Sequence, residues 1–478
     1  MNAWKEKISS YVEAHREELL EDIRALVAIR SDRQDPKPGR PFGDGPVEAL
    51  NLAMELGKKY GFKVTDYNDV VCAIDLDPCQ AGTGEPNLDI LAHLDVVPVG
   101  NDWTVTEPFT MKEVDGCIYG RGTADDKGPA MTALLAMRAV KDLGIPITKR
   151  VRLILGTDEE CGSADIEYYY DREPEAPMTF SPDGNFPLIN IEKGGLQAHF
   201  TASFAEDRAL PRVFSVDGGF KFNVAPATAE AVIEGMSAGA LAPAAKDAEC
   251  VSGVSFQLTD CGTENAPAVR IVTKGTAAHA SLPDGGRNGL TALVSFLGGL
   301  PLADSEGFRK LSWVARTLPY GDFSGQAAGI ARYEEQGGPL TISFDIFHYT
   351  TTSLEGMADC RAALTCSNEN TRDVLLNRFA EGGITMDPED MYEAHIVPGD
   401  SAFVRKLLDC YEVYSGQKGK PIAIGGGTYV HSLKRGVAFG CCVDGFDNRE
   451  HGADERAEVS NLLMSAKIFA LTIAELCQ

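Results

Sequence analysis

The sequence predicts an α/β fold: a doubly wound, mostly parallel sheet domain that carries a large inserted α+β domain. Short apolar runs alternate with helical segments toward both ends of the chain, which is typical of parallel sheets covered by helices. Between residues 191 and 392 the pattern changes to period-2 segments such as 268–273 and 340–346. Because 478 residues exceed what one hydrophobic core usually supports, we expect residues 1–190 and 393–478 to form one domain and residues 191–392 the other.

The first part of the chain gives strand and helix signals in alternation. Residues 88–92 and 151–155 are short apolar runs, as expected for buried strands. Between them, residues 129–143 have apolar positions at helical spacing, with a proline suited to the first turn. A further short strand is expected at 178–180. Each predicted strand is followed closely by an acidic residue or a histidine.

Helical segments at 290–297 and 371–379 interrupt the period-2 segments of the insertion. This combination predicts an antiparallel sheet packed against helices. The alternating pattern then returns, with a helix at 401–414, a strand at 437–442 and a final helix from about residue 458. The simplest arrangement is one α/β domain interrupted by the insertion.

The charge of the chain restricts its partners. It carries 44 basic and 70 acidic residues, a net charge of -26, which argues against binding to nucleic acid or to an anionic membrane. We expect no membrane span, because no run approaches roughly eighteen apolar residues. The first thirty residues are dense in charge, unlike a secretory signal. With twelve scattered cysteines expected to be free thiols, we predict a cytoplasmic protein.

Acidic and imidazole side chains gather just after the predicted strands. Taken singly they have ordinary explanations: an Asp pair before a helix caps it, a Glu pair in a loop is solvated charge, and Asp in Ser-Pro-Asp-Gly is a turn residue. Together they fall at the carboxyl edge of the sheet, where open α/β folds bind ligands. Two histidines and several carboxylates at one edge need a cation to offset their repulsion. The segments are His93-Leu94-Asp95, Gly120 to Gly128, Thr157 to Gly162, Ser181-Pro182-Asp183-Gly184 and Arg449 to Glu455.

These ordered segments resemble the M20 metallopeptidases, hydrolases that use two metal ions, and most of all their PepV-type dipeptidase branch. The resemblance covers essentially the whole chain. It implies a catalytic α/β domain and an inserted lid domain. It also implies a small peptide as substrate.

The resemblance implies a ligand set for two divalent metal ions. One ion would be held by His93, Asp125 and Asp183, and the other by Asp125, Glu160 and His451, with Asp125 bridging. Histidine with carboxylates suits zinc, which is the expected metal, and oxygen-rich sites also accept manganese or cobalt.

Two neighbouring acids receive catalytic roles from the resemblance. Asp95 would accept the far ring proton of His93 and so fix the tautomer of that imidazole. Glu159 would be the general base that takes a proton from the attacking water and returns it to the leaving amine.

Three residues of the insertion match substrate-binding positions of the family. His279, in Lys274 to Ser281, would stabilise the tetrahedral oxyanion. Asn223 would help bind the substrate's carboxylate or oxyanion, and Arg361 would clamp the C-terminal carboxylate. A structural salt bridge of Arg361 to Asp359 or Asp345 is the alternative. The loop Gly425-Gly426-Gly427 resembles a family substrate loop, and no role is assigned to His431.

The motifs leave the substrate open. A dipeptidase is the leading hypothesis. An N-acyl amino acid deacylase or desuccinylase also cleaves an amide beside a carboxylate, and a non-catalytic binding protein could share the fold. The insertion is roughly double a typical hundred-residue unit. In the dipeptidase branch an enlarged lid stands in for a partner subunit, so we expect a monomer.

Overall fold

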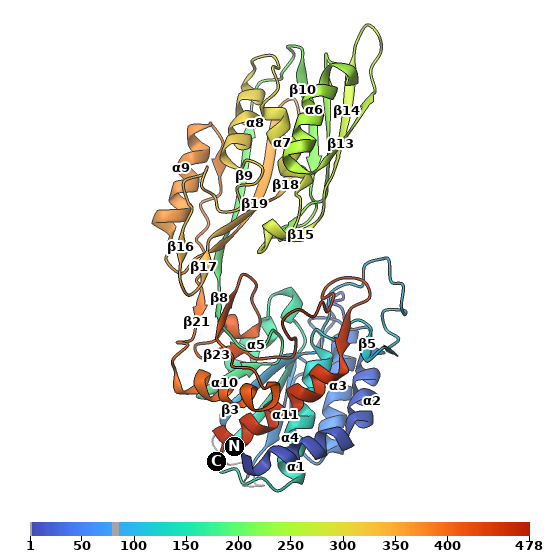
Figure 1. The fold of residues 1–478 in the computed structure, drawn as a ribbon, viewed down its shortest axis with the longest axis vertical. Coiled ribbons are helices and arrows are strands. Elements are labelled where there is room, and N and C mark those ends of the chain that lie inside the picture. The colour runs from blue at the N-terminus through green and yellow to red at the C-terminus, as the bar shows by residue number, and fades with distance from the viewer. Residues whose placement is uncertain (1, 79–85) are drawn as a thin grey trace. The chain divides into compact units, whose positions relative to one another are not determined.

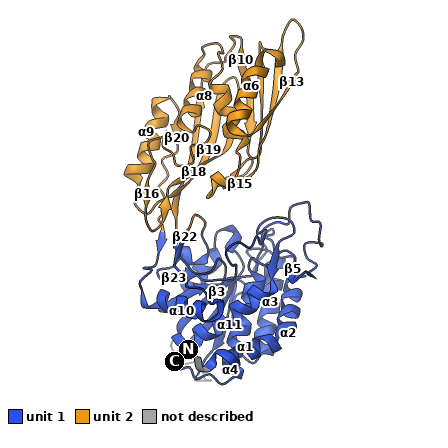
Figure 2. Ribbon diagram, viewed as in Figure 1, with its two compact units in different colours: residues 1–191, 395–422, 427–478 blue, residues 192–394, 423–426 orange. Residues whose placement is uncertain are grey.

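The computed structural model describes residues 2–78 and 86–478. The chain forms two compact units (Figure 2). Unit 1 comprises Met1–Ile191, His395–Ile422 and Gly427–Gln478, and unit 2 comprises Glu192–Ala394 and Ala423–Gly426. The sequence gives no sign that four residues of the last part group with the insertion. They do so because the Lys193 amide donates to the Ile424 carbonyl at 3.0 Å.

Unit 1 is an α/β structure, as the sequence predicts. Helices from both ends of the chain pack together in one core (Figure 1). Its helices are α1 (Asn2–Ala14), α2 (Arg16–Val27), α3 (Asp44–Lys59), α4 (Lys127–Asp142), α5 (Ala164–Tyr170), α10 (Ala402–Ser415) and α11 (Val459–Leu476), with 3-10 turns η1 (Glu159–Cys161) and η4 (Tyr429–Ser432).

A nine-stranded sheet runs in the order β1-β2-β6-β3-β7-β23-β8-β21, with β22 also paired to β8. Its strands are β1 (Lys63–Tyr67), β2 (Val71–Leu76), β3 (Pro86–His93), β6 (Arg150–Gly156), β7 (Met178–Ser181), β8 (Ile189–Glu192), β21 (His395–Ile396), β22 (Ile422–Ile424) and β23 (Gly436–Ala438). The centre, from β6 to β23, is parallel, whereas β1 with β2, β2 with β6 and β23 with β8 pair antiparallel. A small sheet joins β4 (Lys112–Val114), β5 (Cys117–Tyr119) and β24 (Arg456–Glu458).

Strand β3 sends alternate side chains to opposite faces of the sheet. Leu88, Ile90 and Ala92 join the large core with α1, α2, α3, α4, α10 and α11, whereas Leu91 joins a smaller cluster with α5 and η4. Because successive side chains alternate, His93 lies on the same face as Leu91, toward the smaller cluster. Helices therefore cover both faces of the sheet, with more of them on the face of the large core.

Two sequence-based expectations need correction in unit 1. The strand expected at 437–442 ends at Ala438, because the chain then follows the loop after β7: Phe439 donates to Ser181 and Cys442 to Gly184. The expectation of no membrane-length apolar run overlooks α11, which is long and apolar enough by composition. That helix is 67% buried within the structure and packs in the core of unit 1, which explains its apolar composition.

Unit 2 is an α+β structure built on one antiparallel sheet, in the order β13-β14-β12-β10-β18-β19-β9-β20. Helices α6, α7 and α8 lie over it in Figure 1 and contact its strands. The strands are β9 (Gly194–Ser203), β10 (Arg212–Gly218), β12 (Thr228–Glu234), β13 (Ser255–Asp260), β14 (Ala268–Lys274), β18 (Thr341–Tyr349), β19 (Ser353–Ala362) and β20 (Thr385–Met386).

The remaining elements of unit 2 are short or lie beside that sheet. The helices are α6 (Ala238–Ser252), α7 (Gly289–Gly298), α8 (Glu306–Thr317), α9 (Asp373–Glu381), the 3-10 turn η2 (Pro283–Gly285) and the π-helical η3 (Asn368–Arg372). Two-stranded pairs join β11 (Val224–Ala225) to β15 (Ala278–His279) and β16 (Tyr333–Glu334) to β17 (Gly338–Pro339). The first of these pairs contains His279 and begins directly after Asn223, two predicted substrate residues.

Candidate metal centre

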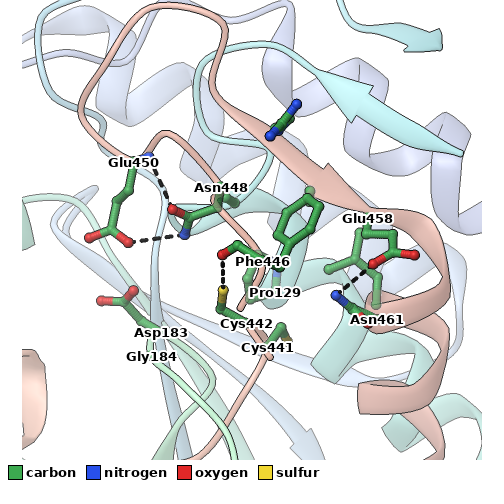
Figure 3. A pocket seen from close by; sticks show the side chains of 14 residues that line it. Pro129, Asp183, Gly184, Cys441, Cys442, Phe446, Asn448, Glu450, Glu458 and Asn461 are labelled. Carbon is green, nitrogen blue, oxygen red and sulfur yellow. Dashed lines mark hydrogen bonds between the residues drawn. The ribbon is translucent and has the colours of Figure 1, made fainter. Parts of the chain in front are cut away.

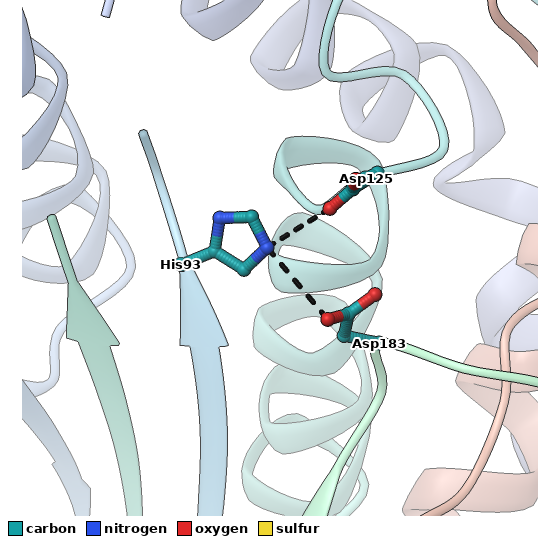
Figure 4. Close-up of side chains that lie close together, drawn as sticks. All are labelled: His93, Asp125 and Asp183. Atoms are coloured by element: carbon teal, nitrogen blue, oxygen red, sulfur yellow. Dashed lines mark ion pairs between the residues drawn. The ribbon is translucent and has the colours of Figure 1, made fainter. Parts of the chain in front are cut away.

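His93 ends strand β3 and is fully buried. Its Nε2 lies 2.9 Å from Asp125 Oδ1 and 3.7 Å from Asp183 Oδ2, as Figure 4 shows. Asp125 comes from the loop before α4, and Asp183 from the turn after β7. Ligand atoms of the three residues all lie within 4.8 Å of one another. Three segments far apart in the sequence thus place one imidazole and two carboxylates together.

A second group forms around His451, in the loop before β24. His451 Nε2 lies 3.0 Å from Asp125 Oδ2 and 3.3 Å from Glu160 Oε2. Asp125 therefore presents one oxygen to each histidine. The carboxylate of Glu450 also falls within 4.8 Å of ligand atoms of Asp125 and His451. The sequence analysis assigned no role to Glu450, whose only signal was its place beside His451.

The loop that carries Asp125 is held by a buried carboxylate. Glu455 Oε1 accepts the amides of Gly122 and Ala124 at 2.9 and 3.0 Å and that of Asp125 at 3.3 Å. Its Oε2 accepts Arg121 Nη1 at 2.6 Å. The sequence does not single out Glu455, because an acid four residues after a histidine has no distinctive pattern.

Asp95 contacts both His93 and the turn η1. His93 Nδ1 lies 3.1 Å from the backbone carbonyl of Asp95 and 3.4 Å from its Oδ1. The carboxylate oxygens also accept the amides of Glu159 and Glu160, at 3.2 and 3.1 Å. Asp95 therefore contacts a proposed metal ligand and the turn that carries both glutamates.

The two histidines are set among carboxylates. Burial alone would lower the pKa of His93, but Asp125, Asp183 and Asp95 outweigh it and hold that pKa well above its ordinary value. Burial likewise opposes protonation of His451, yet hydrogen bonds to Asp125 and Glu160 raise its pKa to about 11. In the same way, hydrogen bonds from both histidines overcome burial and keep the pKa of Asp125 well below its usual range.

The other acids are shifted the opposite way. Burial raises the pKa of Glu159 well above its ordinary value, raises that of Glu160 to about 7 and also raises that of Asp183. Glu160 Oε1 is buried without a hydrogen-bond partner among the described residues. A buried, unpaired carboxylate oxygen is costly unless a cation meets it. The nitrogen and oxygen donor set fits divalent metal ions.

A pocket of about 380 Å³ adjoins this group (Figure 3). Asp183 and Glu450 present carboxylates to it, and Cys441, Phe446 and Leu462 are among its apolar lining residues. The pocket is thus both charged and apolar, as small-molecule sites generally are.

Within unit 2, the structure brings Asn223 and His279 together. Strands β11 and β15 pair Val224 with His279, and the Ala280 amide donates to the Asn223 carbonyl at 2.9 Å. The Ser281 amide donates to His279 Nδ1 at 3.2 Å, so a neutral imidazole carries its proton on Nε2. Asn223 Oδ1 is buried without a hydrogen-bond partner among the described residues.

Arg361 is held by a structural salt bridge within unit 2. Its Nε and Nη2 donate to the two oxygens of buried Asp359 at 2.8 and 2.7 Å. Its Nη1 donates to the Gly425 carbonyl at 2.8 Å, at the start of the glycine loop. These bonds use three of the five N–H groups of a guanidinium. The salt bridge to Asp359, the alternative noted from sequence, is therefore present. His431 lies in η4, with its ring 6.4 Å from that of His395.

Residues 90–475 match the family model for peptidase family M20/M25/M40. The chain belongs to this M20 family. Peptidases hydrolyse peptide bonds, so the protein is a hydrolase, and the fold and the metal-type donor set are those of an M20 metallopeptidase. All the residues of the candidate metal centre lie within the matched range.

Known relatives of the M20 protein extend along its whole length. It is 34% identical over 473 residues to the provisionally named dipeptidase YtjP of Bacillus subtilis (strain 168), covering 97% of the chain and 98% of the relative. It is 32% identical over 470 residues to the Beta-Ala-Xaa dipeptidase of Lactobacillus delbrueckii subsp. lactis, covering 97% of each. Human carnosine dipeptidase 1 shares the fold, with a TM-score of 0.59 at 17% identity over 100% of this chain and 99% of that one.

Proposed function

We propose that this M20 peptidase is a dipeptidase that depends on two divalent metal ions and removes the N-terminal residue of a dipeptide. The observation that carries the proposal is the position of Asp125, whose two oxygens face the imidazoles of His93 and His451 at 2.9 and 3.0 Å. A carboxylate shared by two histidines in this way is suited to bridge two cations. The names of relatives at 34% and 32% identity support the dipeptidase activity.

The residues that would hold the ions are those that surround Asp125. His93 and Asp183 complete one set, and Glu160 and His451 the other. Zinc suits these ligands best, with manganese or cobalt as alternatives. When bound, such ions lower the pKa of water and polarise a carbonyl. The unpaired Oε1 of Glu160 fits this assignment, because a cation would satisfy it.

Glu159 is the proposed general base. It takes the proton of the attacking water and passes it to the leaving amine, which requires a carboxylate whose pKa lies nearer neutrality than usual. The raised pKa of Glu159 supports this role. Asp95 holds the Glu159 backbone and meets the His93 ring, so it positions base and ligand together.

Unit 2 is the proposed lid that contacts the substrate. His279, with its proton on Nε2, would donate to the oxyanion that forms at the reacting carbonyl. Asn223 would donate through its side-chain amide. Arg361 would use its remaining N–H groups on Nη1 and Nη2 for the C-terminal carboxylate, with Asp359 fixing the guanidinium plane.

Two further proposals concern the protein in solution. We infer a monomer, because the inserted unit is large enough to act as a lid without a second chain, and sedimentation giving a dimeric mass would contradict this. A cytoplasmic location accords with cysteines that are all free among the described residues.

A substrate panel tests the function. The purified protein, stripped of metal and reloaded with zinc, manganese or cobalt, is assayed on alanyl and β-alanyl dipeptides and on matched N-acetyl and N-succinyl amino acids. We expect hydrolysis of the dipeptides at rates at least tenfold above the acylated compounds. Preferential cleavage of the acylated compounds would identify a deacylase instead, and no hydrolysis of either set would point to a binding protein.

A further inference from the structure

Tyr429 is buried beside the proposed metal ligand His93, and no step above uses it. It begins the turn η4, two residues after Gly427. Its ring meets the His93 ring edge-on, with centroids 6.0 Å apart and planes at 90°. Its hydroxyl donates to Asp165 Oδ2 at 2.5 Å. The Tyr429 side chain thus contacts the imidazole of His93 and the buried carboxylate of Asp165.

Asp165 in turn fixes the backbone that leads to Glu159. Its Oδ2 also accepts the amides of Thr157 and Asp158, the latter at 2.9 Å. Thr157 and Asp158 directly precede Glu159, so the Asp165 carboxylate sets the course of this loop. A Cβ at Gly156 would lie 2.0 Å from the Tyr429 hydroxyl oxygen and 2.3 Å from Asp165 Oδ2. Only glycine allows the two side chains to approach the strand end so closely.

We propose that Tyr429 is a positioning residue: it orients His93 and holds the Glu159 loop through Asp165. This inference rests on the proposed dipeptidase function. A buried hydroxyl bonded to a buried carboxylate gives a defined geometry. A misplacement of about 1 Å at a catalytic group costs on the order of 100-fold in rate.

The direct test is Tyr429→Phe in the full-length, metal-loaded enzyme. The ring remains, so metal content is expected to match the wild type, and KM to stay within about twofold. The kcat is expected to fall about 10- to 100-fold, and amide hydrogen exchange in residues 157–160 to become faster. Tyr169→Phe is the matched control, because Tyr169 is also buried and its hydroxyl has no hydrogen-bond partner among the described residues. Its kcat should be unchanged.

An unchanged kcat in Tyr429→Phe, or an equal loss in Tyr169→Phe, would overturn the proposal. Asp165→Asn gives a second route to the same answer: it should reduce kcat without raising KM, and adding Tyr429→Phe should cause little further loss. If the kcat losses of Asp165→Asn and Tyr429→Phe multiply in the double variant, the two residues do not act through the same hydrogen bond, which would contradict the proposal. Absence of dipeptide hydrolysis by the wild type would instead refute the proposed function.

Discussion

The carboxylate of Asp95 accepts the backbone amide of Glu159 at 3.2 Å. Asp95, which holds the backbone of the proposed general base, comes two residues after the proposed metal ligand His93. Its other oxygen accepts the Glu160 amide at 3.1 Å. One buried carboxylate therefore fixes the turn that carries both glutamates.

Asp95→Asn tests that support. The new NH₂ group would face an amide N–H where the carboxylate had accepted one, so one hydrogen bond is lost. We expect kcat to fall about 10- to 100-fold, as for other residues that support metal ligands, and the free energy of unfolding to fall by about 1–3 kcal/mol. Asp102→Asn, at an exposed position, is the control. Wild-type kinetics in Asp95→Asn would contradict the assignment.

Glu159→Gln tests proton transfer. A carboxamide cannot accept the proton of water, so kcat should fall by about 10²- to 10⁴-fold. Metal content should be unaffected, because Glu159 is not among the proposed ligands. Steady-state kinetics and metal analysis of the same sample give both answers. Glu167→Gln, exposed on α5, should behave as the wild type. Retention of activity within a few-fold in Glu159→Gln would remove Glu159 from the mechanism.

Glu455→Gln tests the loop that presents Asp125. Glutamine would leave the buried guanidinium of Arg121 without its charge partner. Loss of one partner of a buried pair typically costs about 3–5 kcal/mol, so urea unfolding should show a loss of about that size. Chelator competition should also show weaker metal binding. Exposed Glu107→Gln is the control. Unchanged stability and metal affinity would refute a holding role for Glu455.

The principal metal-type residues could be predicted because they follow strands directly. His93 ends β3 and Asp183 comes just after β7, so the parallel centre of the sheet delivers them to one edge. Glu450, Glu455 and Tyr429 could not be predicted in the same way. Glu450 and Glu455 lie in the loop before β24 and Tyr429 in the short turn η4, and the path of both segments depends on contacts with residues hundreds of positions away.

The same distinction holds for the fold. Apolar runs and helical spacing predicted the α/β class and an inserted α+β structure, since both reflect local periodicity. The antiparallel pairing of β1, β2 and β8 is a property of the sheet as a whole, and local periodicity does not specify it. From the sequence, Arg361 could either bind the substrate or form a structural salt bridge. The salt bridge to Asp359 was foreseeable, because residues two apart in a strand lie on the same face.

Asp345→Asn tests an effect of pH on unit 2. Burial raises the pKa of Asp345 to about 7, whereas an unfolded Asp titrates near 3.9. Between about pH 4 and pH 7, the Asp345 carboxyl keeps its proton in the folded protein but has lost it in the unfolded chain. The free energy of unfolding therefore decreases as the pH rises through this interval, by up to about 4 kcal/mol. The side-chain oxygen of asparagine can still accept the Asn223 amide, and its NH₂ group can donate to the Ser343 hydroxyl, which donates to Asp345 in the wild type.

The check is urea unfolding of both proteins at several pH values. The stability of Asp345→Asn relative to the wild type should increase across this interval. A constant difference between the two proteins would contradict a raised pKa for Asp345. The direction is the informative part, since a carboxylate with a lowered pKa would give the opposite slope.

The central claim is that Asp125 is shared by two metal ions, and metal stoichiometry tests it most directly. Metal content after equilibration with zinc and removal of free ions is measured for the wild type and for His93→Ala, His451→Ala and Asp125→Ala. The account predicts two equivalents in the wild type, about one in each histidine variant and fewer than one in Asp125→Ala. A wild type that binds a single equivalent, or an Asp125→Ala variant that keeps two, would contradict it.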